Sequence, residues 1–372
     1  MTPEPVPRVP ARPTPLPTRT VRTILVMAGG TGGHVMPAMA VADYMRSNGW
    51  LVVWLGSKQG MEATLVPKHG YQMEWIRFSG LRGKGLMRLA LLPLNLLIAF
   101  WQSARVIFRV RPDVVLGMGG YVSFPGGMMA SLLNRPLVVH EQNSIAGLAN
   151  RVLASVADYV LSGFPGVLKK AQWVGNPVRE SIAQLPPPAL RFVSHRDRLQ
   201  LLVVGGSLGA QALNQVVPLA LGLVPEDRRP RVTHQSGAKH LESVRHGYQQ
   251  AGVSVQAVPF IDDMAASYAE ADLVICRAGA LTVSELAAAG VASILVPFPY
   301  AVDDHQSHNA RFLVDAGAAV MVRQTELSSR GLADLLLGLT RERLLEMANR
   351  ARALAKPGAA AAVAEVCMLA AG

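Results

Sequence analysis

The sequence predicts an α/β protein built from two doubly wound halves that face each other across a cleft. Short strands rich in Val, Leu and Ile alternate with longer helical patterns from residue 22 onward. Continuous apolar strands separated by helices are typical of a parallel sheet covered on both faces. The order of strand, glycine turn and helix at 24–42 recurs at 199–217, after a proline-rich stretch at 175–190 that we interpret as a linker.

Each half has its own set of predicted strands. The first half contains "TILVMAGG", "WLVVWLGS", "DVVLGMGG" and "PLVVHEQN". The second contains "LQLLVVGG", "RVTHQSG", "VSVQAVPF", "ADLVICRAG" and "ASILVPFP", and the last forty residues are rich in Ala and Leu and predict helix. Ligands of such sheets bind beyond the carboxyl ends of the strands, where these glycine turns fall, so the turns are expected to line one cleft.

Composition limits the classes of partner and of compartment. The formal net charge of +11 favours an anionic partner, such as acidic lipid, nucleic acid or a phosphorylated substrate, against a generally basic proteome as the alternative. Cys276 and Cys367 are the only cysteines, which argues against a disulfide scaffold or a structural zinc site and favours a reducing cytoplasm. Residues 1–21 are proline-rich with no apolar run and predict a disordered tail.

Three glycine loops are candidate phosphate sites. They lie at 29–33, 117–127 and 205–210. Glycine lets a phosphate approach backbone N–H groups, and a following helix presents its positive end. One such loop is equally well explained by turn geometry, but three that converge on one cleft favour a phosphate ligand.

The loops do not fit the common cofactor motifs. A dinucleotide fingerprint aligned on Gly30 places Val35 where the last glycine belongs, and the second strand ends "WLGSKQ" without an acid at its tip. The third loop, with Ala210 after Gly209, fits no better, and GK[ST] occurs nowhere. NAD and P-loop ATP are therefore disfavoured, while a nucleoside diphosphate remains open.

Glu285 is a candidate for holding a ribose. Its carboxylate can accept hydrogen bonds from two vicinal hydroxyls, but Thr282-x-x-Glu285 is also a capping-box pattern. Both interpretations stay open, and both put Glu285 at a helix N-terminus near the strand ends.

Taken together, these residues resemble the MurG family of bacterial glycosyltransferases. The segments "GGTGGH", "GMGGYVS.PGG", "HEQN", "VGNPVR", "FIDDM", "CRAGALTVSE" and "DDHQ..NA" occur in this order over about residues 22–355. The resemblance implies the GT-B fold, with an acceptor and membrane-associating domain at 22–178, a donor domain at 179–349 and a final helix at 350–372 packing back on the first domain.

The resemblance also implies an activity. Members transfer N-acetylglucosamine from UDP-N-acetylglucosamine to the C4 hydroxyl of lipid I, giving lipid II and UDP in peptidoglycan synthesis, cell-wall biogenesis, cell shape and division. It implies a peripheral enzyme on the cytoplasmic face of the inner membrane that inverts the anomeric centre. Cell-wall synthesis or division proteins are possible partners, and nucleic acid is not expected. No cofactor is implied, and no tight metal site is predicted, although assistance by a divalent ion stays open.

Site residues follow from the matching motifs. Glu285 is expected to bind the ribose hydroxyls, and His34 is the candidate general base. The other expected donor-site residues are Thr31, Gly32, Gly33, Asn143, Arg179, Ser207, Ile261, Ala280, Leu281, Thr282, Val283, Ser284 and Gln306. The expected acceptor-diphosphate residues are Gly30, Gly119, Gly120 and Tyr121.

His34 lies where such a reaction needs a base. A helix N-terminus disfavours an imidazolium and so favours a neutral ring that accepts a proton. The alternative is a histidine that only bonds a loop carbonyl or positions the acceptor diphosphate, and His140 and His305 are weaker rivals. Asp262-Asp263 and Asp303-Asp304 are expected at helix starts or in loops rather than at a metal.

Two positions depart from the family pattern. Leu208 stands where many relatives have Gln, which weakens a side-chain role there, and Phe124 stands where glycine is common, which is expected to reshape the acceptor pocket.

Residues 75–111 predict a membrane-facing surface. They carry seven basic residues and no acidic one, around an apolar run that ends at Phe100-Trp101. Basic residues that rim apolar ones are typical of a surface lying on anionic lipid. The alternative is an ordinary core helix with solvated arginines. A UDP-sugar 2-epimerase would leave this surface unexplained, and a non-catalytic binding module would not need His34.

Overall fold

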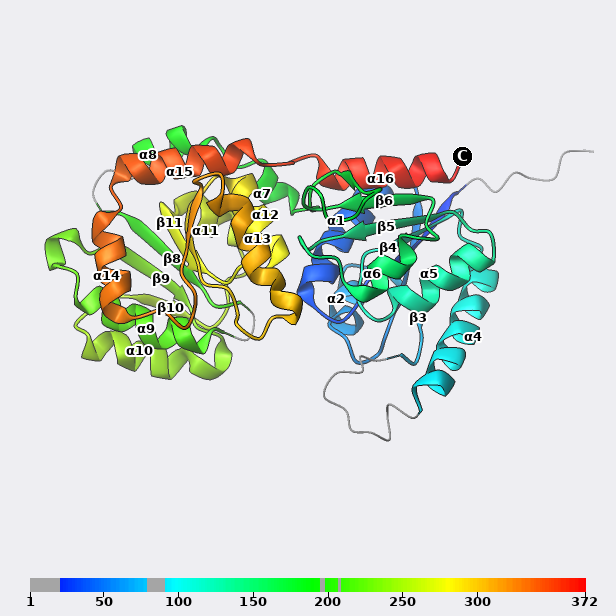
Figure 1. The fold of residues 1–372 in the computed structure, drawn as a ribbon, viewed down its shortest axis with the longest axis horizontal. Coiled ribbons are helices and arrows are strands. Elements are labelled where there is room, and N and C mark those ends of the chain that lie inside the picture. Colours follow the sequence, from blue (N-terminus) through cyan, green and yellow to red (C-terminus); the bar gives the residue numbers. More distant parts are fainter. Residues whose placement is uncertain (1–20, 79–90, 195–197, 207–208) are drawn as a thin grey trace, which may run out of the picture.

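The computed structural model describes residues 21–78, 91–194, 198–206 and 209–372. They form two α/β domains that lie side by side along the long axis of the molecule (Figure 1). Every strand pairing within the two sheets is parallel, as the apolar strands predict. All but the last residue of the predicted tail at 1–21 lies outside the described residues.

The N-terminal sheet has seven strands in the described part of the chain, in the order β3-β2-β1-β4-β5-β6-β7. The strands are β1 Thr23–Met27, β2 Leu51–Gly56, β3 Gln72–Trp75, β4 Val114–Gly117, β5 Leu137–Glu141, β6 Tyr159–Ser162 and β7 Gln172–Trp173. The helices of this domain are α1 Gly32–Ser47, α2 Glu62–Lys68, α4 Leu92–Val110, α5 Ser123–Leu132, α6 Leu148–Leu153 and α16 Ala359–Ala370.

The C-terminal sheet has six strands among the described residues, in the order β10-β9-β8-β11-β12-β13. The strands are β8 Gln200–Val204, β9 Arg231–Gln235, β10 Gln256–Val258, β11 Leu273–Cys276, β12 Ala292–Leu295 and β13 Ala319–Met321. The helices are α7 Glu180–Ala183, α8 Pro188–Ser194, α9 Gln211–Gly222, α10 Leu241–Gln250, α11 Met264–Glu270, α12 Ala280–Ala289, α13 His305–Val314, α14 Ser329–Gly338 and α15 Arg341–Ala353.

Alternation along β1 explains how both faces of the first sheet are covered. Successive side chains of a strand point to opposite faces. Ile24 and Val26 belong to the apolar cluster that α1 and α16 cover, whereas Leu25 and Met27 belong to the cluster shared with α4 and α5. A strand buried on both faces therefore needs an unbroken apolar run, which is the signal read in the sequence.

Each sheet reverses its strand order at one point. The reversal lies between β1 and β4 in the first sheet and between β8 and β11 in the second. At these points Met27 lies beside Gly117, and Val204 lies beside Cys276. The predicted glycine loops leave the sheets there, where ligands of doubly wound folds bind.

The last two helices belong to different domains. Helix α15 packs against α8, α12 and β12, whereas α16 packs against α1 and the N-terminal sheet. The chain crosses between the domains over 354–358, so the returning helix is shorter than the predicted 350–372. Val363, Ala364 and Cys367 of α16 are fully buried, which explains the apolar character of this end of the chain.

Some elements were missed in the sequence. The predicted linker at 175–190 contains α7 and the start of α8, and Ile182 of α7 is fully buried against the C-terminal domain. The strands β3, β6, β7 and β13 were also missed. Each has two to four residues, too few for a period to show.

Helix α4 buries one face and exposes the other. Ala99, Ser103, Val106 and Ile107 are buried. Within the part of the chain that the structure describes, no helix is both long and apolar enough to span a bilayer.

Candidate active site

Two glycine loops of the N-terminal domain are packed backbone against backbone. Gly120 has φ +84°, and a Cβ added to it would lie 2.1 Å from the carbonyl oxygen of Gly29. The Ser123 hydroxyl, at the start of α5, donates to the carbonyl oxygens of Met27 (2.9 Å) and Gly119 (2.7 Å). The N-termini of α1 and α5 are thereby brought to one edge of the sheet, where their partial positive charges suit an anionic group.

Glu62 fixes the first of these loops, and sequence reasoning missed it. Its carboxylate is fully buried and accepts hydrogen bonds from Gly30 N (2.9 Å), Ser57 N (3.0 Å) and Ser57 Oγ (2.9 Å). A side chain on Gly29 would meet this carboxylate at 2.7 Å. Nothing in the local sequence shows this contact, because Glu62 lies 32 residues beyond Gly30.

His34 lies in the first turn of α1 and faces the loops that follow β4 and β5. Its Nδ1 is 2.8 Å from Oε1 of Gln142. A Cβ on Gly119 would lie 2.6 Å from that nitrogen, so the ring occupies space that only a glycine leaves open. The half-buried ring therefore has a fixed orientation beside both glycine loops.

The rival histidines lie elsewhere. His140 is fully buried on β5, its Nε2 donates to the Gly175 carbonyl at 2.9 Å, and burial lowers the pKa of His140 to about 4. A fully enclosed ring does not reach a substrate, so His140 is not a base candidate. His305 starts α13 in the opposite domain.

The "HEQN" segment is organised by its glutamate. The buried carboxylate of Glu141 accepts from Asn143 N (2.9 Å), Gly147 N (3.2 Å) and Asn150 Nδ2 (2.8 Å). These bonds hold the turn after β5. The turn presents Asn143 at the domain junction, where its Oδ1 accepts from Asn309 of α13 at 3.4 Å.

Asn309 joins the two domains. Its Oδ1 accepts from both the backbone N (2.9 Å) and the hydroxyl (2.8 Å) of Ser144, and its Nδ2 donates to the Ala278 carbonyl at 3.2 Å. The side chain is fully buried, so these contacts are made away from water. Its position in the "DDHQ..NA" segment was the only sign of this role in the sequence.

Glu285 lies in the second turn of α12, beside the connector that joins the two domains after β7 (residues 174–178). Its Oε1 accepts from Arg179 Nη2 at 3.0 Å and its Oε2 from the Tyr268 hydroxyl at 3.3 Å. Burial raises the pKa of Glu285, while Arg179 opposes that shift. The capping-box interpretation is wrong: α12 begins at Ala280 with Gly279 as N-cap, so Thr282 lies inside the helix.

The remaining predicted donor residues surround the start of α12. Ile261 is buried just after β10, and Ala280–Ser284 form the first turns of α12. The Gln306 amide oxygen accepts from Phe298 N at 2.9 Å, which ties α13 to the loop after β12. Ser207 and Leu208 lie outside the described residues, although Gly206 is held there by Gln235, whose Nε2 donates to its carbonyl at 3.0 Å.

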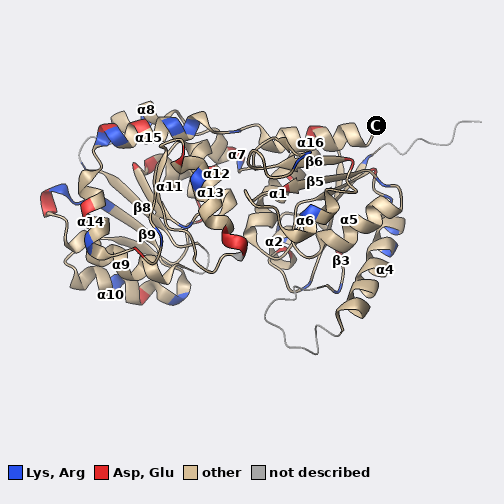
Figure 2. Cartoon of the chain, viewed as in Figure 1, with Lys and Arg blue, Asp and Glu red and all other residues tan. Residues whose placement is uncertain are grey.

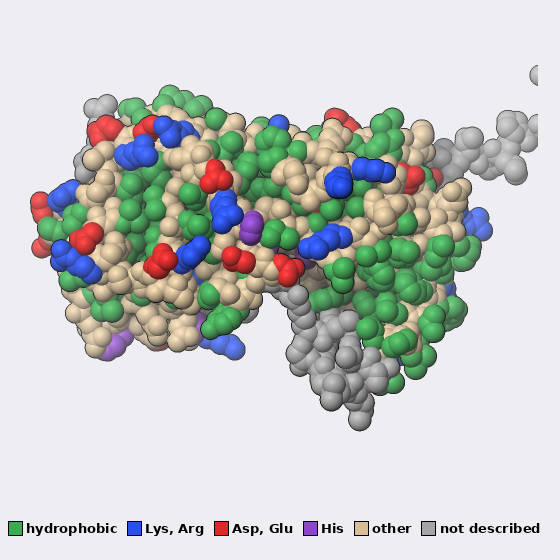
Figure 3. All heavy atoms as spheres, viewed as in Figure 1, with side chains coloured by type: hydrophobic (Ala, Val, Ile, Leu, Met, Phe, Trp, Pro, Cys, Tyr) green, Lys and Arg blue, Asp and Glu red, His purple; other side chains and the backbone are tan. Residues whose placement is uncertain are grey.

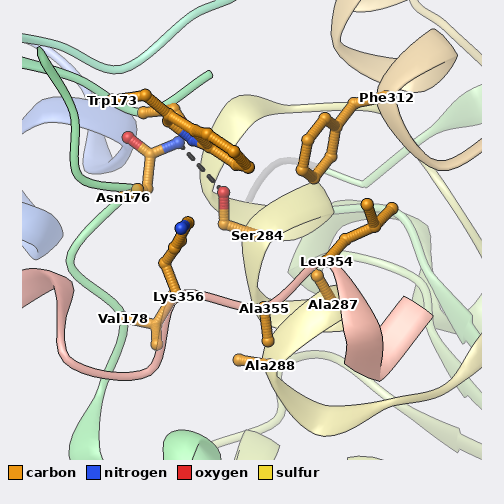
Figure 4. Close-up of a pocket in the computed structure, with 12 residues that line it drawn as sticks. Trp173, Asn176, Val178, Ser284, Ala287, Ala288, Phe312, Leu354, Ala355 and Lys356 are labelled. Carbon is orange, nitrogen blue, oxygen red and sulfur yellow. Dashed lines mark hydrogen bonds between the residues drawn. The ribbon is translucent and has the colours of Figure 1, made fainter. Parts of the chain in front are cut away.

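The domain junction has a small cavity behind this site (Figure 4). Asn176 donates from Nδ2 to Ser284 Oγ at 2.9 Å across it, and Lys356 lies over the Trp173 ring at 4.2 Å from its centroid. The space holds about 20 Å³, enough for roughly one water molecule. It is a packing gap of the connector, too small for a nucleotide.

The acidic pairs occupy the expected kinds of position. Asp263 caps α11, accepting from Ala266 N at 2.9 Å, and Asp303-Asp304 lie in the short turn before α13. Among the described residues, no group of three His, Cys, Asp or Glu side chains is arranged to hold a metal ion.

Phe124 takes part in the packing between α4 and α5, and its expected effect on the acceptor pocket stays a prediction. It lies on α5 and packs on the apolar cluster of β1 and β4, with its ring 6.0 Å from that of Phe100 on α4. The bulk that replaces glycine thus strengthens the contact between α4 and α5.

The chain matches known proteins along most of its length. The profile of the glycosyltransferase family 28 N-terminal domain matches residues 24–162, and that of the C-terminal domain matches residues 200–365. A UDP-N-acetylglucosamine–N-acetylmuramyl-(pentapeptide) pyrophosphoryl-undecaprenol N-acetylglucosamine transferase of Cupriavidus metallidurans is 64% identical over 95% of this chain and 99% of its own length.

Solved structures agree. The crystal structure of Acinetobacter baumannii MurG matches with a TM-score of 0.82 and 40% identity over 94% of this chain and 99% of that one. A UDP-GlcNAc 2-epimerase from Neisseria meningitidis matches with a TM-score of 0.63 over 94% of this chain and 100% of its own. At 12% identity, that second likeness shows the shared fold alone.

Two Rossmann-like domains with parallel sheets, together with the family 28 profiles and the MurG structure, define a glycosyltransferase of the GT-B fold, as the sequence predicted. The chain belongs to glycosyltransferase family 28 and, within it, to the MurG family.

The contact between the two glycine loops gives a first prediction. Gly120→Ala is expected to lower the free energy of unfolding by several kcal/mol, because the new methyl group meets the Gly29 carbonyl, and to reduce activity with it. Gly49→Ala is the matched control, since Gly49 has a similar φ of +80° with no atom within 4 Å of the added Cβ. It is expected to cost only the backbone strain of a positive φ, about 1–2 kcal/mol. Urea unfolding measures both, and equal losses would contradict the contact.

Proposed function

We infer that this enzyme transfers N-acetylglucosamine from UDP-N-acetylglucosamine to lipid I, forming lipid II and UDP in peptidoglycan synthesis. The observation that supports this inference is the match to transferases named for this reaction. The match is at 64% identity and covers both domains and nearly the whole of each chain. The two substrates differ in kind, one a soluble nucleotide sugar and one a lipid. Two domains that meet at their strand ends suit this division.

We propose that His34 is the general base. In this step the ring takes the proton of the acceptor C4 hydroxyl, the C4 oxygen bonds the anomeric carbon, and UDP leaves with the bonding pair. Attack opposite the leaving group inverts the anomeric centre. Supporting this role, the ring lies between the two glycine loops with one nitrogen already held by Gln142. Positioned bases contribute about 10²–10⁴-fold to such steps.

The diphosphate of the donor is expected to lie at the start of α12, with the Glu285 carboxylate toward the ribose. The helix N-terminus and loop N–H groups stabilise the departing UDP without a resident cofactor or a tight metal site. The loop at Gly30 and the loop at Gly119, Gly120 and Tyr121 are expected to bind the acceptor diphosphate.

The acceptor lies in a bilayer, and α4 provides a surface suited to one. Leu94, Leu97, Trp101 and Phe108 expose 55%, 65%, 60% and 64% of their surface. Hydrophobic side chains cover the side of the N-terminal domain over α4 and α5 (Figure 3), and Lys and Arg residues accompany α4 (Figure 2). We propose that this face lies on the cytoplasmic leaflet of the inner membrane, as a peripheral contact.

The charge of this surface is smaller than the predicted window of 75–111 suggests. Arg109 forms an ion pair with Glu74, which lies just outside the window. Arg105 lies over the exposed Trp101 ring at 5.7 Å from its centroid, so a cation and an apolar group share this part of the helix. Arg82, Lys84 and Arg88 lie outside the described residues. An interaction with cell-wall synthesis or division proteins stays a prediction.

Transfer itself is tested with radiolabelled UDP-N-acetylglucosamine and a lipid I analogue. Label is expected in the lipid fraction with the wild type. His34→Ala is expected to lower kcat by about 10²–10⁴-fold, because a positioned base is lost. Near-wild-type turnover of that variant at saturating substrate would mean that another group accepts the proton.

The donor site is tested by calorimetric titration with UDP. Glu285→Gln is expected to weaken binding by about tenfold or more, since hydrogen bonds to a charged group contribute about 1.5–3 kcal/mol each. Glu180→Gln removes one negative charge from an exposed position at the start of α7 and serves as the control, with unchanged affinity expected. Equal affinity of Glu285→Gln and wild type would rule out a carboxylate contact with the ribose.

Membrane contact is tested by vesicle sedimentation. Binding is expected to rise with anionic lipid and fall with salt, at about 1 kcal/mol per basic residue near the surface. Leu97→Ser is expected to weaken it about tenfold or more, because burying a leucine contributes about 1.5–3 kcal/mol. Leu219→Ser, at a leucine of α9 that exposes 56%, is the matched control. Binding insensitive to both salt and lipid charge would exclude an electrostatic contact.

A further inference from the structure

A chain of hydrogen bonds runs from the domain connector to His34. The Gly175 carbonyl is 2.9 Å from Nε2 of His140, and Nδ1 of His140 is 3.1 Å from Nε2 of Gln142. Oε1 of Gln142 is 2.8 Å from Nδ1 of His34. The two side chains that link Gly175 to His34, those of His140 and Gln142, are completely or almost completely buried. The direction of each bond follows from which atoms can only accept.

The first link fixes the protons of His140. A carbonyl oxygen only accepts, so His140 must donate to Gly175 from Nε2. Burial lowers the pKa of His140 to about 4, so the ring is neutral at physiological pH and has only that one N–H. Its Nδ1 is therefore a lone pair that can only accept.

The second link fixes the amide of Gln142. Its Nε2 lies 3.1 Å from Nδ1 of His140 and also 3.1 Å from the His140 carbonyl oxygen. Both of these atoms only accept, and the amide NH2 has two hydrogens to give them. A flipped amide would set its oxygen against two lone pairs in a buried place. The Gln142 oxygen must therefore face His34.

The last link fixes His34 itself. An amide oxygen only accepts, so Nδ1 of His34 carries a proton. A neutral imidazole has one N–H, which leaves Nε2 with its lone pair. We propose that Gln142 and His140 are positioning residues that hold His34 in this tautomer, with Nε2 ready to take the proton of the acceptor hydroxyl. This inference rests on the proposed role of His34 as base.

The series of hydrogen bonds begins at the domain connector, which explains why the tautomer of His34 does not depend on substrate. Gly175 belongs to the connector between the domains, with φ +88° and Lys356 against its α-carbon. The next residue, Asn176, donates to the Gln142 carbonyl at 3.0 Å and to Ser284 of the opposite domain at 2.9 Å. Backbone groups of the fold thus set the direction of each hydrogen bond in the series before either substrate binds.

The direct test is nitrogen NMR of enzyme labelled with 15N-histidine, without substrates. The His34 signals are identified by their loss in His34→Ala. The wild type is expected to show a protonated Nδ1 and an unprotonated Nε2 on His34. A proton on Nε2 in place of Nδ1 would overturn the proposal, and His34→Ala is needed only to assign the signals.

The kinetic test uses two substitutions of similar size at Gln142. Gln142→Met removes the acceptor, so His34 is expected to lose the fixed tautomer. We expect kcat to fall by about 10–10⁴-fold, the upper value being typical of a catalytic histidine held in the wrong tautomer. Gln142→Glu is the rescue variant as a buried neutral acid, because its carbonyl oxygen accepts from Nδ1 of His34 and its O–H donates to Nδ1 of His140 in place of the amide NH2. It is expected to keep the tautomer and a higher kcat than Gln142→Met.

Two readouts separate positioning from mere folding. The KM for UDP-N-acetylglucosamine is expected to stay near wild type in Gln142→Met while kcat falls. The unfolding temperature of this variant is expected to fall, because Nδ1 and the carbonyl oxygen of His140 lose their buried donor, so kcat is measured well below that temperature. Wild-type kcat with a wild-type tautomer in Gln142→Met would overturn the positioning role. Absence of any transfer by the wild type would instead overturn the proposed function, and the NMR result does not depend on that assay.

Discussion

The site depends on one close contact, in which the backbone of the loop after β4 lies directly on the backbone of the loop after β1. Only a residue without a side chain fits at Gly120, because any Cβ would lie 2.1 Å from the Gly29 carbonyl. This contact holds the N-termini of α1 and α5 at one edge of the sheet. It also leaves the space at Gly119 that the His34 ring fills. The geometry of the two glycine loops and the position of the candidate base thus share one steric cause.

Buried polar groups then hold the loops in place. Glu62 ties the first loop to the turn after β2, Glu141 organises the turn after β5, and Asn309 carries that turn across to the C-terminal domain. Each of these side chains is satisfied by several partners, as buried polar groups must be. Removing one leaves its partners unpaired, so such networks rigidify a site. The hydrogen bonds from Gly175 to His34 are another such buried network. In this network, the order of donors and acceptors determines the tautomer of His34.

The two domains are joined by a connector that also takes part in the site. Arg179 follows it directly and pairs with the buried carboxylate of Glu285, while Asn176 bonds both domains. Only the carboxylate side of this ion pair is buried, and the desolvation of Glu285 offsets part of the attraction to Arg179. The Glu285 carboxylate is accordingly held in a definite place, beside the first turns of α12.

The sequence by itself determined the fold class, the nine main strands and the glycine loops, because apolar runs and glycine turns are local signals of a parallel sheet and its switch points. It also placed His34 and Glu285 in their motifs. It did not reveal the contacts of Glu62, the end of α15 at Ala353, or the packing of Phe124 against Phe100. Those features depend on which distant segments meet: a carboxylate 32 residues from its loop, a helix that ends where the chain crosses to the other domain, and a ring that fits against α4. Only the tertiary structure decided them, because contact across the fold leaves no period or motif in the chain.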